Sequence, residues 1–386
     1  MINMQTNNNS NNIRFFVSDL NTIEGNAIAQ LQTVADYEGM CEVVALPDIH
    51  LGKGAPVGAA FLTKNLFYPY LTGNDIGCGM SLWMTHLKKH KAKRDLWIKK
   101  LANLDEPLDQ KFISHNINVD VDDGFKPDPE NLTLGTLGGG NHFVELSMIE
   151  SIEDIDSFKA LNLDKSNLYL LIHSGSRDKG ETLLRKHISR FKDGGLTENS
   201  PEALQYLKEH GYAVRWADAN RDLLSLRVLK SLGTSGIKIL SSCHNSISLK
   251  VIDNQSYWLH RKGAASSENH AVLIAGSRGD LSYIVKPAGD QKNNLWSLAH
   301  GAGRKWKRGE CKARLHKRFS VKDLTHTKLG SRVVCEDKEL LYQEAPQAYK
   351  NIQKVIQELQ NHGLITVIAT LKPLITYKKR KYRGIR

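Results

Sequence analysis

The sequence has no apolar run that could span a lipid bilayer, for which about 20 consecutive apolar residues are needed. Its start, MINMQTNNNSNNIRFF, is rich in asparagine and lacks the apolar centre of a secretory signal peptide. We therefore expect a cytoplasmic protein without a membrane partner.

Cysteine is scarce and scattered. The cysteines are odd in number, and no two of them have the CxxC spacing. This distribution indicates neither a disulfide framework nor a zinc ribbon. Each cysteine therefore has to be interpreted from its own neighbours; they are Cys41, Cys78, Cys243, Cys311 and Cys335.

Standard nucleotide-binding loops are also missing. Glycine-rich stretches recur, but none reads GxxxxGK followed by Ser or Thr, and no GxGxxG opens a helix after a strand. We expect neither a P-loop nor a Rossmann unit. Any nucleotide would have to bind in another kind of pocket.

Acidic residues are too few to balance the basic ones, which leaves a formal net charge of +12. The excess is concentrated in KKHKAKR near residues 88–94, in GRKWKRGECKARLHKR from residue 303, and in YKKRKYRGIR at the end. Such clusters favour a polyanionic partner and, without an evident amphipathic membrane helix, nucleic acid over lipid. From charge alone, a solvated basic face is an equally good interpretation.

Strands and helices are mixed along the chain. Strands are predicted at CEVVALPD, LYLLIHSGS, HAVLIAGSRGD, LSYIVKP and ITVIATLKP. One helix is predicted to start after Asn199 or Ser200 and to run to 211, and a second to cover 213–232 and stop at Gly233. Because there is no regular βαβ period, repeat or linker, the pattern favours one elaborated α+β domain with mixed sheets.

A set of short stretches suggests a metal site. LTGNDIGCGMSL, residues 71–82, places Asp75 three positions before Cys78 among glycines, and His142, His173 and His244 each lie beside small residues. Taken singly, each histidine is more often a hydrogen-bonded structural residue than a ligand, but the recurrence favours ligands. The set suffices for one metal with open positions, or for two metals if the thiolate bridges them. It suits zinc or iron at least as well as manganese.

Nine stretches in a fixed order identify a family. They are ALPDIHLGKGAPVG, GNDIGCGM, GTLGGGNHFVE, IHSGSR, CHNS, HRKGA, GSRGDLSYIV, HGAGR and LKPL. Each is weakly specific alone, but together they resemble the RtcB family of RNA ligases over roughly residues 45–378.

The resemblance implies a GTP-dependent RNA ligase for RNA repair or splicing. An RNA 3′-phosphate or 2′,3′-cyclic phosphate would be joined to a 5′-hydroxyl through a histidine–GMP intermediate and then an RNA 3′-diphosphate-guanosine intermediate. His300 of HGAGR would carry the GMP, and two Mn²⁺ ions would be the cofactors. By similarity, one ion would be held by Asp75, Cys78 and His142, and the other by Cys78, His173 and His244.

The resemblance also implies a nucleotide pocket, in which this chain departs from its family. Ala275 and Arg278 stand where the family usually has Pro and Met. Lys378 would contact guanine, although Lys379 could take its place, because further basic residues follow here. The implied pocket residues are Asn141, His142, Phe143, Val144, Glu145, His244, Asn245, Ala275, Gly276, Ser277, Arg278, Ser282, His300, Gly301, Ala302, Gly303 and Lys378.

Arginine is expected to anchor the RNA ends, since its guanidinium fork suits phosphate. The implied anchors are Arg177, Arg304 and Arg308. The partner would be RNA with broken ends, tRNA or rRNA above all, and an activating protein is a further candidate. The expected organisation is a flexible segment 1–12, a catalytic domain 13–378 and a basic tail 379–386.

Two other functions remain open from the sequence. A binuclear metal phosphodiesterase or phosphatase acting on RNA ends would use the same ligands but would need neither His300 nor GTP. A non-catalytic RNA-binding repair accessory would need only the basic clusters.

Overall fold

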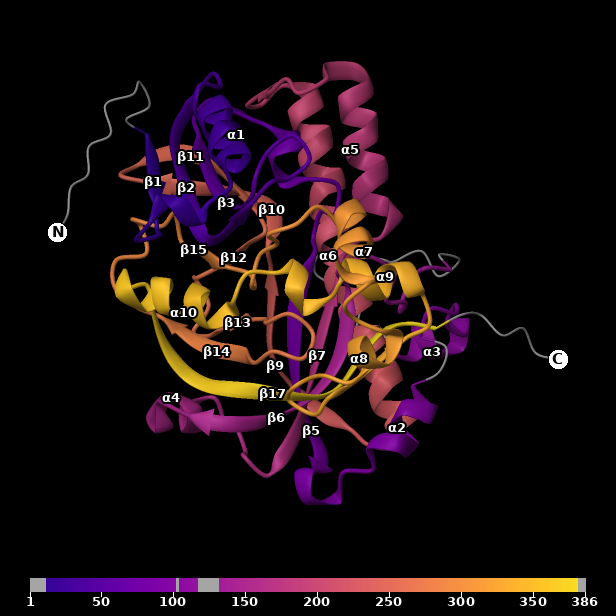
Figure 1. Ribbon diagram of the computed structural model, residues 1–386. Helices are drawn as coiled ribbons and strands as arrows, with labels where there is room; N and C mark the ends of the chain where they lie inside the picture. The colour runs from indigo at the N-terminus through magenta and orange to yellow at the C-terminus, as the bar shows by residue number, and fades with distance from the viewer. Residues whose placement is uncertain (1–11, 102–103, 117–131, 381–386) are drawn as a thin grey trace.

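Figure 1 shows the computed structural model of the chain, which describes residues 12–101, 104–116 and 132–380. Within these residues, two larger β-sheets form the framework. One has five strands and lies in the upper left of the view; the other has eight strands and fills the lower half. Most of the expected segments 1–12 and 379–386 lies outside the described residues.

The eight-stranded sheet has the order β13-β14-β17-β6-β7-β5-β9, and β16 pairs with β17. Its strands are β5 (Gly79–Lys88), β6 (Phe143–Ile152), β7 (Asn167–Ser174), β9 (Gly236–Cys243), β13 (Val272–Ile274), β14 (Ser282–Pro287), β16 (Arg332–Cys335) and β17 (Ile365–Lys379). The strands predicted near 168, 270, 281 and 365 are therefore confirmed. Strand β17 continues to Lys379, one residue into the segment that was expected to be a tail.

Strand β7 lies in the middle of this sheet and is buried along its whole length. Leu170 and Ile172 pack in the core on one face, whereas Tyr169 and Leu171 pack in the core on the other. A strand that is covered on both faces carries apolar residues at successive positions, which explains the unbroken run LYLLI. His173 continues on the Tyr169 face, because side chains alternate along a strand.

The five-stranded sheet has the order β1-β2-β3-β11-β10. Its strands are β1 (Ile13–Phe15), β2 (Met40–His50), β3 (Val57–Thr63), β10 (Asn245–Ile252) and β11 (Gln255–Lys262). Helix α1 (Gly25–Ala35) covers it, and Ala27, Leu31 and Val34 pack against Val43 and Phe61. The predicted strand at CEVVALPD is the central part of β2.

The two sheets are connected at His244. Strand β9 of the larger sheet ends at Cys243, and strand β10 of the smaller sheet begins at Asn245. The backbone N–H of His244 donates to the carbonyl of Cys78, 2.8 Å away. A side chain on this one residue therefore lies where both sheets meet.

Helix α6 (Pro201–Leu232) was expected as two helices, and this expectation is wrong. The side chain of Ser200 caps its first turn, and Gly233 ends it in the left-handed conformation, so both predicted ends are confirmed. The helix nevertheless continues through Gly211 without a break. An interior glycine costs a helix only about 1 kcal/mol. The burial of Leu224 and Val228 against the eight-stranded sheet, and of Trp216 against Ile113 of α3, outweighs that cost.

The remaining helices surround the sheets. α5 (Asp178–Phe191) lies beside α6 at the upper right of Figure 1, and α10 (Ile352–Asn361) lies at the left. Helices α7 (Arg308–Leu315), α8 (Val321–Thr325) and α9 (Lys338–Gln343) share a small core around Leu341. The others are α2 (Arg94–Lys100), α3 (Gln110–Asn116) and α4 (Ile155–Ala160), and the short strands are β4 (Leu66–Phe67), β8 (Leu196–Thr197), β12 (Ala264–Ser266) and β15 (Ser297–Ala299).

The architecture confirms the α+β class. Among the named strands, parallel pairing is confined to β1 with β2 and β16 with β17. The described residues therefore contain no doubly wound parallel sheet, although β1, α1 and β2 form one parallel crossover. None of the described helices combines the length and the hydropathy that crossing a bilayer requires.

Candidate functional site

A cavity of about 590 Å³ lies where the two sheets meet. Its wall is formed by the loop before β5, the start of β6, the end of β7, the β9–β10 junction, the loop that holds His300 and the end of β17. Segments far apart in the sequence thus deliver polar side chains to one place.

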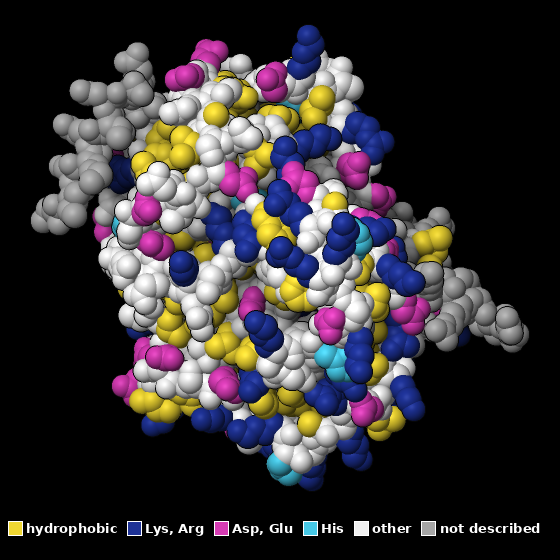
Figure 2. Space-filling view, in the orientation of Figure 1, with side chains coloured by type: hydrophobic (Ala, Val, Ile, Leu, Met, Phe, Trp, Pro, Cys, Tyr) yellow, Lys and Arg dark blue, Asp and Glu magenta, His cyan; other side chains and the backbone are white. Residues whose placement is uncertain are grey.

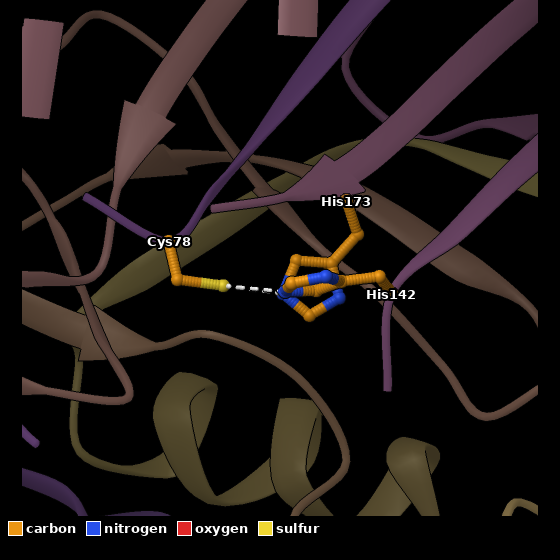
Figure 3. Close-up of side chains that lie close together, drawn as sticks. All are labelled: Cys78, His142 and His173. Atoms are coloured by element: carbon orange, nitrogen blue, oxygen red, sulfur yellow. Dashed lines mark hydrogen bonds between the residues drawn. The ribbon is translucent and has the colours of Figure 1, made fainter. Parts of the chain in front are cut away.

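Four of the predicted metal ligands lie close together beside this cavity. Cys78 Sγ lies 3.3 Å from Nε2 of His173 and 3.5 Å from Nε2 of His142 (Figure 3). Nε2 of His173 lies 3.3 Å from Nε2 of His244. All four side chains are buried. Two imidazole nitrogens lie close to the sulfur, and Nε2 of His244 lies close to that of His173. Thiolate sulfur and imidazole nitrogen are ligand atoms for metal ions such as zinc and iron.

Asp75 completes the set. Its Oδ2 lies 2.8 Å from Nε2 of His142, and its Oδ1 is buried without a hydrogen-bond partner among the described residues. A buried carboxylate oxygen with no partner is costly unless a cation binds it. The residues present therefore fit a metal centre, with five side chains from four segments of the chain.

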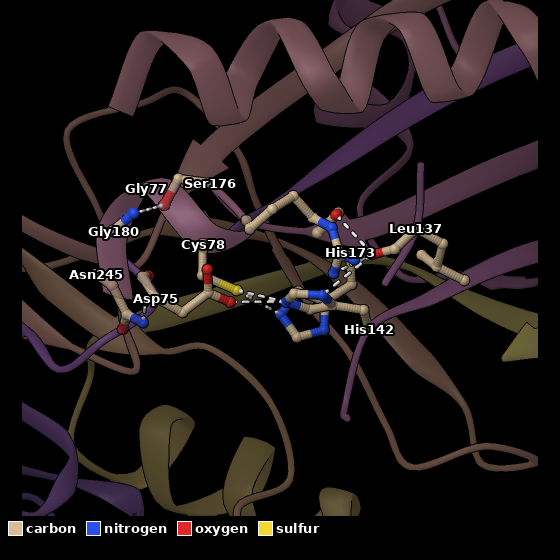
Figure 4. A network of polar contacts seen from close by, with 12 residues as sticks. Asp75, Gly77, Cys78, Leu137, His142, His173, Ser176, Gly180 and Asn245 are labelled. Atoms are coloured by element: carbon tan, nitrogen blue, oxygen red, sulfur yellow. Dashed lines mark hydrogen bonds and ion pairs between the residues drawn. The ribbon is translucent and has the colours of Figure 1, made fainter. Parts of the chain in front are cut away.

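The backbone around Cys78 leaves little choice of residue. Gly77 has φ +78°, and a Cβ there would lie 2.8 Å from Cβ of Ala217 and 2.9 Å from Cα of Val214, both in α6. The side chain of Asn245 donates to the carbonyl of Asp75, 3.0 Å away (Figure 4). The ligand loop is thus pressed against the long helix and tied to β10, which holds Asp75 and Cys78 rigidly.

A carbonyl group behind the cluster orients His142. Nδ1 of His142 lies 3.2 Å from the carbonyl oxygen of Leu137, so this nitrogen can donate to that oxygen while Nε2 faces Asp75 and Cys78 (Figure 4). The same oxygen accepts from Ser174 Oγ at 3.1 Å and from Arg177 Nη1 at 3.4 Å. Ser174 and Arg177 therefore hold the segment that leads to His142.

Burial sets the protonation of the ligands. It lowers the pKa of His173 and of His244 well below the usual range, and the neighbouring histidines add to the effect. Both rings are therefore neutral, as metal binding requires. Burial and the nearby Asp75 raise the pKa of the Cys78 thiol well above its usual range. A bound cation would reverse that shift and release the thiol proton.

His300 lies next to the ligand cluster and is paired with a buried carboxylate. Its ring centroid is 4.8 Å from that of His244, and its Nδ1 is 2.7 Å from Oδ2 of Asp48. Asp48 is fully buried, and its Oδ2 also accepts from the backbone N–H of His300 at 3.2 Å. The two atoms lie within ion-pair distance but do not meet hydrogen-bond geometry in this structure. A carboxylate beside Nδ1 favours a proton on that nitrogen, which would leave the lone pair of Nε2 available.

Glu145 and Lys378 also line the cavity. Burial raises the pKa of Glu145 to about 7, and its carboxylate accepts from Thr376 Oγ1 at 2.6 Å. Nζ of Lys378 lies 5.9 Å from the centroid of the Phe143 ring and 3.2 Å from Oε2 of Glu344. Lys379 does not line the cavity and lies 3.8 Å from Asp337. Of the two lysines considered for the pocket, the structure brings Lys378 to it.

Comparison with known proteins decides the family. The family model described as "tRNA-splicing ligase RtcB" matches residues 30–121 and 115–379. The chain is 46% identical to RNA-splicing ligase RtcB2 of Escherichia coli strain ATCC 25922 over 92% of this chain and 93% of that protein. The chain belongs to the RtcB family.

More distant RtcB proteins align along nearly the same length. RNA-splicing ligase RtcB of Escherichia coli K12 is 27% identical, with 92% of this chain and 95% of that protein covered. tRNA-splicing ligase RtcB of Nanoarchaeum equitans is 26% identical, with 87% and 88% covered. The resemblance inferred from nine short stretches is thus confirmed over most of the chain.

Most of the residues that the RtcB resemblance implied do line the cavity. His142 and Val144 do not. His142 lies behind the wall, where its Nε2 contacts Asp75 and Cys78. Val144 alternates with Phe143 and Glu145 along β6 and packs in the core on the far face. Ser282 acts on the wall from behind, since its Oγ accepts from the backbone N–H of Gly276 at 3.3 Å. The implied residues that line the cavity are Asp75, Cys78, Asn141, Phe143, Glu145, His173, His244, Asn245, Ala275, Gly276, Ser277, Arg278, His300, Gly301, Ala302, Gly303, Arg304, Arg308 and Lys378.

The three arginines implied as RNA anchors differ in their surroundings. Arg177 does not line the cavity, and its guanidinium packs over Gly138, where a Cβ would collide with it. Arg304 lines the cavity, but all five of its N–H groups have acceptors. They donate to Trp306 O, Glu344 Oε1, Tyr349 Oη, Gln343 O and Cys311 Sγ. Among the residues that the structure describes, Arg308 makes one side-chain hydrogen bond, to Glu344 at 2.8 Å, and it is partly exposed.

Sequence reasoning missed two carboxylates of this RtcB site. Asp48 lies inside the stretch ALPDIHLGKGAPVG. A carboxylate in an otherwise apolar strand could have identified it as a candidate site residue. Glu344 is 3% exposed and accepts from Arg304, Arg308 and Lys378, which come from distant segments. It lies in EAPQAYK, a stretch that carries no chemical pattern when read alone.

Proposed function

We propose that this chain is a GTP-dependent RNA ligase that joins an RNA 3′-phosphate or 2′,3′-cyclic phosphate to a 5′-hydroxyl. The observation that supports this most directly is the pairing of His300 with Asp48 beside the ligand cluster. A metal hydrolase needs no such oriented histidine, whereas a nucleotidyl transfer through a covalent intermediate does.

In the proposed first step, Nε2 of His300 attacks the α-phosphorus of GTP. A P–N bond forms, and the bond between that phosphorus and the pyrophosphate oxygen breaks. Asp48, 2.7 Å from Nδ1, offsets the positive charge that the ring acquires. The small residues Gly301, Ala302 and Gly303 leave room for the nucleotide beside the ring.

Two transfers complete the proposed reaction. An oxygen of the RNA 3′-phosphate attacks the phosphorus of the bound GMP, the P–N bond breaks, and its electron pair returns to Nε2 of His300. The 5′-hydroxyl then loses its proton and attacks the phosphorus that was the RNA 3′-phosphate, and GMP leaves. A 2′,3′-cyclic phosphate would first be opened by water to the 3′-phosphate.

Two Mn²⁺ ions are the proposed cofactors. Asp75, Cys78 and His142 would hold one ion, and Cys78, His173 and His244 the other, with the thiolate shared. Bound there, the ions supply positive charge against phosphate oxygens. The protein contributes neutral imidazoles, a rigid ligand loop and burial from water.

The proposed partner is RNA with broken ends, with tRNA and rRNA as candidates. Figure 2 shows Lys and Arg side chains gathered across the middle of the face that carries α7. Lys53, Lys307 and Arg308 belong to the rim of the cavity. A basic rim around a site that handles RNA ends would attract the phosphate backbone.

We expect Arg308→Ala to lose RNA affinity and Arg304→Ala to lose stability. Arg308 has donors free for a phosphate, so its loss should weaken RNA binding and lower the slope of log affinity against log salt by about 0.7 to 0.9. All the N–H groups of Arg304 already donate hydrogen bonds within the protein. Its replacement removes one of the hydrogen bonds that the buried carboxylate of Glu344 accepts. That variant should lose about 3 kcal/mol of stability.

Salt titrations of RNA binding and thermal melts separate the two variants. A melting temperature that falls as much for Arg308→Ala as for Arg304→Ala would contradict this assignment. So would an unchanged salt slope for Arg308→Ala.

We expect Asp48→Asn to slow formation of the protein–GMP adduct by about 10³-fold or more, in line with the loss when an orienting aspartate becomes an amide in a hydrolase triad. The amide keeps the size of the side chain but cannot offset charge on the His300 ring. Metal content should stay unchanged, because Asp48 touches no ligand of the cluster. Single-turnover measurement with α-labelled GTP gives the rate, and a rate near that of the wild type would contradict the role of Asp48.

One experiment distinguishes the three functions considered. The protein is incubated with Mn²⁺ and α-labelled GTP, and a denaturing gel reveals label on the protein; γ-labelled GTP serves as the control. A ligase retains the α label and not the γ label. A phosphodiesterase cleaves a cyclic-phosphate RNA end without becoming labelled, and an accessory protein does neither.

A further inference from the structure

Arg278 is a buried cation that lacks acceptors. Its side chain lines the cavity and is 6% exposed. Nη2 donates to the carbonyl of Leu341, whereas Nε and Nη1 have no hydrogen-bond partner among the residues described. Leaving charged donors unsatisfied in a protein interior costs about 1–3 kcal/mol or more. A ligand with acceptor atoms would remove that cost.

The nearest carboxylate cannot supply the missing acceptor. Oε1 of Glu344 accepts from Arg304 and Arg308, and its Oε2 accepts from Tyr349 and Lys378. Burial lowers the pKa of Arg278 only to about 10, so the guanidinium keeps its charge at neutral pH. Arg278 is therefore a cation beyond those that Glu344 already binds.

The position of Arg278 suits a nucleotide base rather than the reacting phosphate. The segment that ends at Arg278 starts at Ala275, which forms a β-bridge with Gly301 next to His300. The Phe143 ring lies 5.5 Å from the His173 ring on one side and 5.9 Å from Lys378 Nζ on the other. A nucleotide with its phosphate at His300 would lay its base along Phe143, toward Lys378 and Arg278.

The hydrogen-bonding groups of Arg278 and Lys378 favour guanine over adenine. Arg278 and Lys378 can only donate hydrogen bonds, and guanine presents two acceptors, O6 and N7, along one edge. Adenine presents an amino group in place of O6, which these donors would repel. The Glu145 carboxylate, which also lines the cavity, offers acceptors for the N1 and N2 hydrogens of guanine.

We propose that Arg278, with Lys378, binds the O6/N7 edge of the guanine base and is a specificity-determining residue of this chain. The inference rests on the proposed function, because it assumes a guanine nucleotide in the cavity. It concerns a residue that stands where the family usually has an apolar one, so it predicts a property particular to this protein.

The test compares equilibrium binding of GMP and 7-deaza-GMP, which lacks the N7 acceptor, in the presence of Mn²⁺. The full-length wild type should bind 7-deaza-GMP about 10- to 100-fold more weakly than GMP, the discrimination typical of arginine on this edge. Arg278→Met should bind the two nucleotides within about threefold of each other. IMP, which lacks the N2 amino group and thus probes Glu145, should be disfavoured equally in both proteins.

Three outcomes overturn the inference. The wild type could bind GMP and 7-deaza-GMP with equal affinity. This measurement uses the wild type alone, so it does not depend on whether a variant folds. Arg278→Met could keep the full preference for GMP over 7-deaza-GMP. It could also bind both nucleotides more weakly by the same factor, which would indicate that Arg278 contacts a phosphate. If the wild type bound no guanine nucleotide at all, the proposed function itself would fail, which is a separate result from equal binding.

Discussion

Replacement of His300 with alanine is expected to abolish the covalent protein–GMP adduct. The wild type, incubated with Mn²⁺ and α-labelled GTP, should become labelled through a bond that is labile in acid and stable in base, as a phosphoramidate to histidine is. Among the described residues, no other histidine in or beside the cavity has a carboxylate at Nδ1. Nδ1 of His50 lies 2.8 Å from the carbonyl oxygen of Asp48, and Nδ1 of His142 faces the carbonyl of Leu137. Nε2 of His173 and Nε2 of His244 face each other within the ligand cluster. No second nucleophile is therefore ready to replace His300.

The control for this experiment is His270→Ala. His270 is exposed and lies outside the cavity, so that variant should be labelled as fully as the wild type. His300→Ala should keep its metal content, because His300 is not one of the ligands. Adduct formation at normal yield in His300→Ala would remove this residue from the nucleophile role and with it the main support for a ligase.

Replacement of Cys78 with alanine is expected to remove more metal than any single histidine replacement. The sulfur lies within 3.5 Å of Nε2 of both His142 and His173, so one thiolate serves both proposed ion positions. Its loss also removes negative charge that offsets two dications. Cys78→Ala should lose both ions, whereas His142→Ala and His244→Ala should each lose mainly one.

Metal analysis of the purified proteins measures this directly, without any activity assay. Cys41→Ala is the control, since Cys41 is exposed in β2 and distant from the cluster in the fold. Loss of a single ion in every variant, Cys78→Ala included, would argue against a shared thiolate. Retention of both ions in Cys78→Ala would exclude the cysteine as a ligand.

The sequence by itself determined the chemistry that is present and the class of fold. Asp75 and Cys78 lie in a glycine-rich turn, and the three histidines lie beside small residues, because a ligand cluster needs small neighbours. These patterns involve adjacent residues only, so the sequence shows them. The caps of α6 at Ser200 and Gly233 were predictable for the same reason, since capping depends on adjacent residues only. The order of nine stretches was enough to indicate the family.

The tertiary structure alone decided which side chains contact one another and which donors already have hydrogen-bond acceptors within the protein. Asp48 lies 252 residues from His300, so no local pattern could reveal their pairing. Glu344 binds two arginines of one segment and Lys378 of another, and both segments are distant from it in the sequence. Arg304 and Arg308 look alike in the sequence, yet one has every donor occupied and the other does not. Continuity of α6 through Gly211 likewise depended on burial against the sheets. Hydrogen bonding and burial are properties of the folded surroundings of a residue, and a sequence records only which residue is there.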